Sequence, residues 1–194
     1  MKSPQVSLVK ASLDDLGFIL SCSQQTSLQN RRPQSLAEMG FLVSDFTEQE
    51  YRVFIGRADH FYIANVARVG PAGFVLAYSD CLIDKDKEWT NALLSYYLYR
   101  PFVLIKQICV SDDFSSMGVG ASLYGHVAKC NAGIPLVAAV VSVPPNERSM
   151  HFHSKQGFRN IMEVNPPADV GRCVSIWWKG NGYDGDCSRV ITMN

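Results

Sequence analysis

The stretch VSDDFSSMGVGASLYGHV, from Val110 to Val127, joins a run typical of a buried strand to a run with the periodicity of a helix. Gly118-Val119-Gly120 stands at the junction. Glycine lets another group approach the backbone closely, and the first N–H groups of a helix have no partner within the helix. Such a helix start is a common binding place for phosphate. The junction therefore indicates either a phosphate-binding turn or a tight turn in which glycine only relieves steric crowding.

Two familiar phosphate-binding motifs do not fit this junction. A P-loop requires Gly-Lys followed by Ser or Thr, and no such triplet follows the turn. A Rossmann fingerprint lies on the first strand and has a third glycine three residues after the second, where this chain has Leu123. A phosphate site at this junction must therefore belong to another class of fold.

The composition is that of a globular protein of one domain. Of the 194 residues 47% are apolar and 19% are charged, and 18 basic residues balance 18 acidic ones. A net charge of zero gives no general electrostatic reason to bind nucleic acid or an anionic membrane. Six cysteines without a Cys-x-x-Cys pair predict no metal site. Because no secretory signal or long apolar run is present, we expect a cytoplasmic protein that binds neither nucleic acid nor membrane.

Apolar periodicity and turn residues predict the order strand, two helices, three strands, helix, strand, helix, strand. This order favours an α/β (α+β) fold with one sheet. Ser12 with Asp15, and Thr47 with Glu50, have the spacing of capping boxes at helix starts. Residues 70–73 (Gly-Pro-Ala-Gly) indicate a hairpin turn. The predicted strands are 6–11, 60–69, 73–80, 102–110, 135–143 and 172–180, and the predicted helices are 12–25, 46–57, 119–131 and 144–157.

The segment ICVSDDFSSMGVGASLY resembles the acyl-CoA-binding motif of the GNAT superfamily of N-acyltransferases. The family pattern is Arg/Gln-x-x-Gly-x-Gly/Ala between a central strand and a helix. Gly118 and Gly120 occupy the two small positions, and Ser115 stands where the family usually has Arg or Gln.

A second segment, NERSMHFHSKQGF, resembles the family's Asn-x-x-Ser/Ala-x-x-Leu/Phe-Tyr/His-x-Lys-x-Gly-Phe motif. Because both motifs occur in order with a buried strand between them, the chain is identified as a member of the family over residues 6–180. The matching residues are Asn146, Ser149, Phe152, His153, Lys155, Gly157 and Phe158.

The resemblance implies a GNAT-like fold, a mixed and mostly antiparallel central sheet flanked by helices. Strands 102–110 and 135–143 would be parallel neighbours that splay apart at the coenzyme site. It also implies a single domain at 6–180 with a C-terminal tail at 181–194, and acetyl-CoA (coenzyme A) as co-substrate without a metal. The implied coenzyme-binding residues are Ile108, Cys109, Val110, Met117, Gly118, Val119, Gly120, Ala121, Ser122, Asn146, Ser149, Phe152 and Lys155.

The resemblance also assigns candidates for catalysis. His153 stands where many members have a Tyr that protonates the leaving thiolate. Histidine can act as an acid near neutral pH, or His153 packs beside the coenzyme or forms a local hydrogen bond. Many members have a Glu base on the central strand, where this chain has Lys106 and Gln107. Gln107 is therefore the candidate to position a water molecule, and Asp112 and Asp113 are either a proton relay or solvated loop charges.

In this family the acceptor enters between the N-terminal helices and the loops that connect strands, here about Gln29–Asp45 and Cys81–Arg100. The second segment combines aromatic and acidic residues, which suits a cationic amine with an apolar body or a dimer contact. These residues are Asp84, Asp86, Glu88, Trp89, Tyr96, Tyr97 and Tyr99.

The resemblance therefore predicts an acetyl-CoA-dependent N-acetyltransferase whose acceptor is the primary amine of a small molecule, peptide or protein. The amine would attack directly in a ternary complex. A homodimer is the prediction if the aromatic segment Cys81–Arg100 is a dimer contact. The first alternative is a non-catalytic acyl-CoA-binding module on the same fold, which Ser115 and the missing Glu favour. The second is an interaction protein in which the glycine turn is only structural. The acceptor, the length of the acyl group and the general base are left open.

Overall fold

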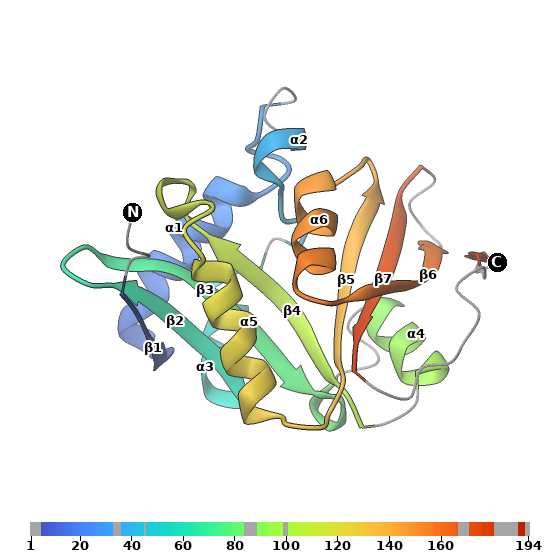
Figure 1. Cartoon of the computed structure of the whole chain (residues 1–194), viewed down its shortest axis with the longest axis horizontal. Coiled ribbons are helices and arrows are strands. Elements are labelled where there is room, and N and C mark those ends of the chain that lie inside the picture. Colours follow the sequence, from blue (N-terminus) through green and yellow to red (C-terminus); the bar gives the residue numbers. More distant parts are fainter. Residues whose placement is uncertain are drawn as a thin grey trace. The chain divides into compact units, whose positions relative to one another are not determined.

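The computed structural model of the chain describes residues 5–32, 36–44, 46–83, 89–98, 101–166, 171–180 and 190–192. Its strands form one mixed sheet in the order β1-β2-β3-β4-β5-β7-β6-β8 (Figure 1). The strands are β1 (Val6–Lys10), β2 (His60–Val66), β3 (Gly70–Ser79), β4 (Val103–Val110), β5 (Leu136–Val143), β6 (Arg159–Asn165), β7 (Cys173–Lys179) and β8 (Val190–Thr192). This arrangement confirms the α/β (α+β) fold class.

Helices connect these strands. They are α1 (Leu16–Thr26), α2 (Leu36–Met39), α3 (Glu48–Arg57), α4 (Trp89–Tyr97), α5 (Val119–Cys130) and α6 (Glu147–Lys155). The chain divides into two compact units, one of residues 1–77 and 106–130 and the other of residues 78–105 and 131–194. β4 has residues in both units, and β8 lies within the segment predicted as a tail.

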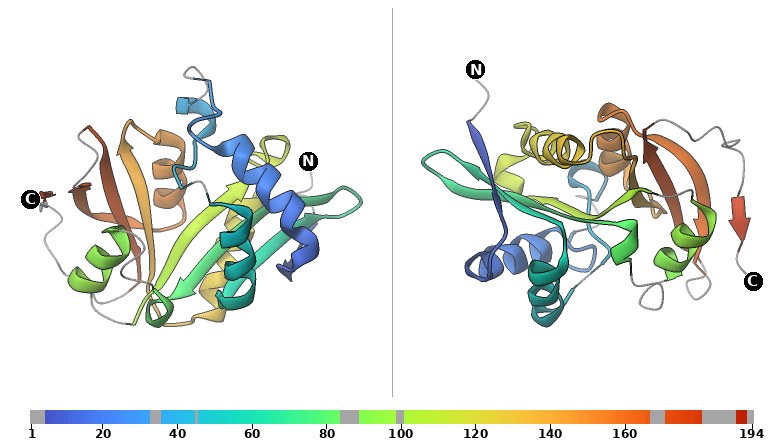
Figure 2. Two further views of the ribbon diagram at one scale, coloured as in Figure 1. Left: turned by 180° about the vertical axis from the view of Figure 1, so that it is seen from behind. Right: turned by 90° about the horizontal axis from the view of Figure 1, so that it is seen from below.

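In the first unit, β1 and β2 pair antiparallel, as do β2 and β3. α5 packs on the face over β1 and β2, while α1 and α3 pack together on the opposite face (Figure 2). Both faces of the sheet are therefore covered by apolar side chains, which explains the nearly continuous apolar runs in its strands. Fully buried side chains of this unit include Ile19, Tyr51, Phe61, Phe74 and Leu123.

Both predicted capping boxes are confirmed. The Thr47 N–H donates to Glu50 Oε2 at 2.8 Å, and the Glu50 N–H donates to Thr47 Oγ1 at 3.3 Å. The Ser12 N–H donates to Asp15 Oδ2 at 2.8 Å. A cap of this kind satisfies N–H groups that the helix itself leaves unpaired, which explains why these two helices begin where the sequence predicts.

In the second unit, β7 pairs antiparallel with both β5 and β6, and β8 pairs parallel with β6. β4 and β5 are parallel, as predicted, and their ladder covers Val103–Ile105 opposite Leu136–Ala138. α6 packs on β5. The short ladder means that β4 continues through residues 106–110 beyond its pairing with β5.

Two details of the predicted strand pattern are wrong. The hairpin between β2 and β3 turns at residues 67–69, and the Gly-Pro-Ala-Gly stretch lies inside β3. Gly73 is needed for close approach, because a Cβ there would lie 2.5 Å from the Cys109 carbonyl oxygen of β4. β6 was not predicted, because a bulge between Asn160 and Met162 interrupts the apolar alternation on which strand prediction depends.

None of the helices in the described ranges combines the length and the apolar character that a membrane crossing requires.

Candidate functional site

A 3₁₀ helix (Asp112–Phe114) and a turn connect β4 to α5. Ser116 and Gly118 in this turn have φ angles of 63° and 85°, in the left-handed region that favours glycine. A side chain at Gly118 would meet nothing within 4 Å, so the space beside this residue is open. The Ser122 N–H donates to the Gly118 carbonyl at 2.9 Å, which starts the helical ladder. The N–H groups of residues 119–121 precede that ladder and are available to an anion.

The residues predicted to bind phosphate differ in exposure. Met117 and Gly118 are exposed, and Gly120, Ala121 and Ser122 are half-buried. Val119 is only 1% exposed because its side chain packs in the core. An anion at this turn would therefore be held by backbone N–H groups, because the Ser122 hydroxyl donates to the Gly118 carbonyl at 3.1 Å, while the Val119 side chain anchors the helix.

β4 presents its predicted coenzyme-binding residues in two ways. Ile108 and Val110 are half-buried, whereas Cys109 is 2% exposed. The Cys109 thiol donates to the Cys22 carbonyl at 3.1 Å, and the two Sγ atoms lie 2.8 Å apart as free thiols. The hydrogen bond between the two thiols, together with burial, raises the pKa of Cys22. Cys109 is therefore a core side chain, and only its backbone could serve the predicted role.

Gln107, the candidate to position a water molecule, has both ends of its amide engaged. Its Oε1 accepts from the Tyr51 hydroxyl at 2.8 Å, and its Nε2 donates to the Ser44 carbonyl at 2.6 Å. Tyr51 also contacts Ser23 Oγ at 2.8 Å, and its burial raises its pKa. Gln107 is itself 3% exposed. These contacts favour a role in joining β4 to α1, α3 and the segment before α3.

His153 lies on α6 in the second unit and is 2% exposed. Its Nδ1 lies 2.7 Å from the Ser149 carbonyl, which can only accept, so Nδ1 carries the proton. The ring packs between Phe158 (centroids 5.3 Å apart) and Trp177 (6.0 Å). Burial lowers the pKa of His153 to about 4, so the imidazole is neutral at pH 7. Of the two roles predicted for His153, these contacts favour packing with a local hydrogen bond over acid catalysis.

The other predicted coenzyme residues of the second unit also lie on α6. Asn146 occupies the N-cap position and is 3% exposed, but its side chain makes no capping hydrogen bond to this helix. Ser149 and Phe152 are half-buried, and Lys155 is exposed at the last helical position. Contacts of these four side chains with a coenzyme stay a prediction.

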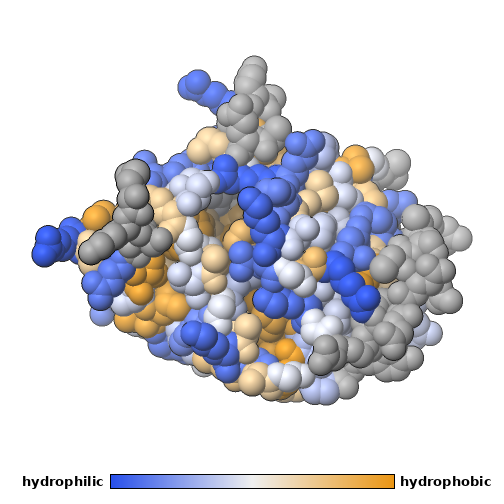
Figure 3. All heavy atoms as spheres, viewed as in Figure 1, coloured by the Kyte–Doolittle hydropathy of each residue, from blue (hydrophilic) through white to orange (hydrophobic). Residues whose placement is uncertain are grey.

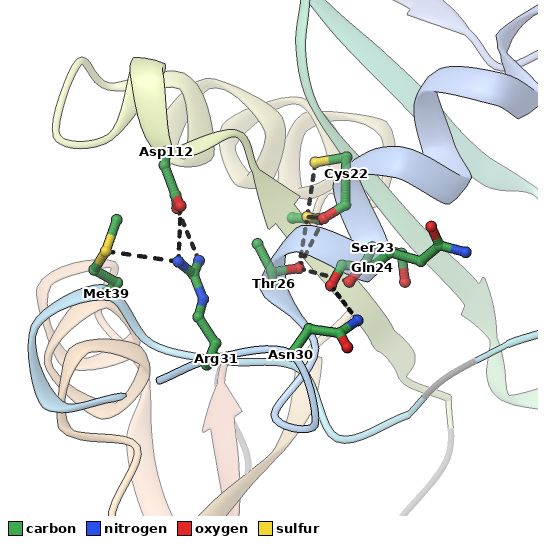
Figure 4. A network of polar contacts seen from close by, with 9 residues as sticks. Cys22, Ser23, Gln24, Thr26, Asn30, Arg31, Met39 and Asp112 are labelled. Carbon is green, nitrogen blue, oxygen red and sulfur yellow. Dashed lines mark hydrogen bonds and ion pairs between the residues drawn. The ribbon is translucent and has the colours of Figure 1, made fainter. Parts of the chain in front are cut away.

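An ion pair connects the loop after α1 to the segment between β4 and α5 (Figure 4). Arg31 donates from both terminal nitrogens to the two Asp112 oxygens, at 2.7 and 2.8 Å. Asp112 is therefore an ion-pair partner, which differs from both roles predicted for it. Asp113 is exposed, as expected of a solvated loop charge.

A groove of about 460 Å³ follows α5 on the side of β1. Ala121 and Ser122 from the predicted phosphate turn line it, together with His126 and Lys129. Figure 3 shows apolar residues at the surface over β1 and β2, and Val9 of β1 is 44% exposed. Lys129 lies in the last turn of α5, at the end of the helix away from the glycine turn.

The two predicted acceptor segments are described only in part. In the first, Leu42 and Ser27 form an isolated parallel bridge that closes the loop between α1 and α3. In the second, Tyr96 of α4 is 81% exposed and Tyr97 is 42% exposed. The remaining residues named for the second segment lie outside the described residues or have side chains outside them. They are Asp84, Asp86, Glu88, Trp89 and Tyr99.

Tyr51 and Arg31 were not among the predicted site residues. The helical period predicts that Tyr51 is buried, but no local pattern shows that its hydroxyl meets a side chain 56 positions away. Arg31 lies in a polar stretch typical of a turn, and its partner is 81 positions away. In the described part of the chain, no group of three His, Cys, Asp or Glu residues is placed to hold a metal ion.

No protein-family model matches the sequence, and a comparison with curated protein sequences gives no match. Solved structures do resemble it. Naa20 from Chaetomium thermophilum in complex with a bisubstrate analogue has a TM-score of 0.66 at 11% identity, over 96% of each chain. NAA60 from Arabidopsis thaliana in complex with acetyl-CoA has a TM-score of 0.61 at 12% identity, over 91% of this chain and 99% of that one.

A Desulfovibrio desulfuricans protein described as a GNAT-family acetyltransferase has a TM-score of 0.63 at 12% identity, over 91% of this chain and 99% of that one. Similarity at this level of identity is similarity of fold. The mixed, mostly antiparallel sheet, the parallel pair β4–β5 and the glycine turn before α5 are the features that the sequence resemblance implied. The chain therefore has the fold of the GNAT acetyltransferases.

Proposed function

We propose that the chain is an acetyl-CoA-dependent N-acetyltransferase that transfers the acetyl group directly to the primary amine of an acceptor. The observation that supports this most is the turn before α5, where Gly118 is left-handed, exposed and open on its side-chain side. The N–H groups of the first helical turn are available there to a pyrophosphate. The bisubstrate analogues and acetyl-CoA held by proteins of the same fold support the choice of ligand.

The reaction needs a neutral amine, a polarised thioester carbonyl and a proton for the leaving thiolate. The amine nitrogen attacks the thioester carbon and the C–N bond forms, the C–S bond then breaks, and coenzyme A leaves as a thiolate that gains one proton while the nitrogen loses one. Because His153 is neutral at pH 7 with its proton on Nδ1, it is a poor acid for the thiolate. Proximity of the two reactants in one ternary complex would then supply much of the rate.

A non-catalytic acyl-CoA-binding module is the second candidate function. Two observations favour it: the Gln107 amide is fully engaged with Tyr51 and Ser44, and the His153 ring is buried and neutral. Turnover separates the two candidates. Release of coenzyme A from acetyl-CoA in the presence of a panel of peptide and small-molecule amines supports the enzyme. Coenzyme binding without release with any of the amines supports the module.

The test of the coenzyme site is a calorimetric titration of the protein with acetyl-CoA and with free coenzyme A. We expect one-to-one binding by the parent and loss of binding by Gly118→Glu, which puts a carboxylate against the phosphates. Gly133→Glu is the matched control, because Gly133 has a φ of 84° and equally open space. Absence of binding by the folded parent contradicts the proposed function. Equal binding by the two variants places the phosphates elsewhere.

A further inference from the structure

The Arg31–Asp112 pair is unusually well fixed for an ion pair between two loops. Both terminal nitrogens of Arg31 engage both oxygens of Asp112, the two-point geometry in which guanidinium and carboxylate bind most strongly. The Arg31 side chain is 6% exposed and that of Asp112 is 38% exposed. A guanidinium buried to this extent requires a counter-charge, because burial of an unpaired cation is costly. Figure 4 shows the pair beside the end of α1.

The backbone on the Arg31 side of the pair is held by the end of α1. The Arg31 N–H donates to the Ser27 carbonyl at 3.1 Å, and the Leu28 N–H donates to Leu42 at 2.8 Å. The Leu42 N–H in turn donates to Thr26, also at 2.8 Å. Arg31 therefore projects from a closed loop, and this loop belongs to the segment predicted to meet the acceptor.

The backbone on the Asp112 side begins the turn that the proposed function assigns to the coenzyme phosphates. The Ser111 N–H donates to Ala72 of β3 at 2.9 Å, which fixes the end of β4. The Asp112 carbonyl accepts from the Ser115 N–H at 3.0 Å, at the first residue of the turn. A movement of Asp112 would therefore be transmitted directly to the backbone that leads to Gly118.

Charge adds a second effect. The phosphates of a coenzyme are anionic, and a carboxylate close to their site opposes their binding unless a cation compensates it. Arg31 supplies that cation. Without it, Asp112 would add a second negative charge to that of the exposed Asp113, six positions before Gly118.

We propose that Arg31 is a positioning residue for the coenzyme: through Asp112 it fixes the phosphate turn and cancels the carboxylate charge beside it. This inference rests on the proposed function. It makes coenzyme affinity depend on the loop after α1, which would otherwise be assigned only to the acceptor. Acceptor-side changes that move this loop should then alter coenzyme binding, and the converse holds by linkage.

The test is a calorimetric titration of the full chain with coenzyme A at low and high salt, on the parent and on Arg31→Ala, Arg31→Lys and Arg31→Ala/Asp112→Ala. We expect Arg31→Ala to weaken binding on the order of tenfold or more, equivalent to about 1.4 kcal/mol. Arg31→Lys keeps the charge but not the two-point geometry, so it should fall between the parent and Arg31→Ala. The double variant should recover part of the affinity, because it removes the uncompensated carboxylate.

Arg52→Ala is the matched control, since Arg52 forms an exposed pair with Glu48 at 2.7 Å on α3 and its removal changes the net charge equally. It should bind as the parent does. A smaller salt dependence of affinity in Arg31→Ala identifies the charge effect, whereas partial unfolding would lower the stoichiometry instead. If the parent binds coenzyme A, and Arg31→Ala and Arg52→Ala bind it with equal affinity, this inference is overturned while the proposed function stands. No binding by the folded parent overturns the proposed function and this inference with it.

Discussion

The buried imidazole of His153 makes the stability of the fold depend on pH. Its pKa is lowered from 6.5 to about 4 by burial, against the smaller opposing effect of the hydrogen bond to Ser149. Between these two values the unfolded chain binds a proton that the folded chain does not, so stability falls as the pH falls through this window. Each pH unit is worth about 1.4 kcal/mol. Between pH 7 and pH 4 the free energy of unfolding therefore falls by roughly 3 kcal/mol.

The perturbation that isolates this cost is His153→Asn. The Asn amide can donate to the Ser149 carbonyl as Nδ1 does, but it has no proton to gain in this range. Loss of ring volume destabilises the variant at every pH, so the informative quantity is the change with pH. Urea unfolding of parent and variant at pH 7.5 and 4.5 gives it. The parent should lose roughly 2–3 kcal/mol more than the variant between these two conditions.

His151→Asn is the control, because His151 is exposed on the same helix. That variant should follow the pH dependence of the parent. Identical pH dependence of the parent and His153→Asn would refute the conclusion that His153 is buried and neutral. It would also restore the possibility that His153 is the acid, in which case His153→Ala should lower kcat by roughly 10²–10⁴.

Three further predictions concern the strand β4 and its neighbours. Gly73→Ala should destabilise the fold by about 1–3 kcal/mol in urea unfolding, since its Cβ would meet a β4 carbonyl oxygen at 2.5 Å. Gly56→Ala in α3, where a Cβ would meet nothing within 4 Å, should instead stabilise the fold by about 0.5–1 kcal/mol, and equal effects of the two substitutions would contradict the close approach at Gly73. Tyr51→Phe should cost about 1–3 kcal/mol because it leaves the buried Gln107 oxygen without its donor, and a cost indistinguishable from zero would count against that hydrogen bond. Gln107→Glu should be less stable than the parent at pH 7, and the difference in stability should shrink as the pH falls, because only a protonated carboxyl can donate to the Ser44 carbonyl. A difference in stability that does not vary with pH would exclude this cause.

Local signals in the sequence predicted most of the elements and the glycine turn before α5, and long-range contacts decided the rest. The Thr47–Glu50 capping box, the spacing of Val119, Leu123 and Val127 and the glycine at 118 each act within a few residues, so their consequences follow from sequence order alone. Gly73 is different, because the group that it accommodates belongs to another strand. A glycine that permits close packing and a glycine that permits a turn look the same in a sequence, which is why the hairpin turn was misplaced.

The same distinction explains why the glycine turn before α5 was recognisable in the sequence and the contacts of Gln107 and Arg31 were not. A helix N-terminus with glycines has its chemistry in its own backbone, whereas the chemistry of Gln107 depends on the Tyr51 hydroxyl on one side and the Ser44 carbonyl on the other. An amide satisfies both, because it offers an acceptor and a donor. A carboxylate at this position could not donate to the Ser44 carbonyl, because both of its oxygens only accept hydrogen bonds. The contacts of Gln107 with Tyr51 and Ser44 therefore account for an amide at this position of β4, whatever reaction the chain catalyses.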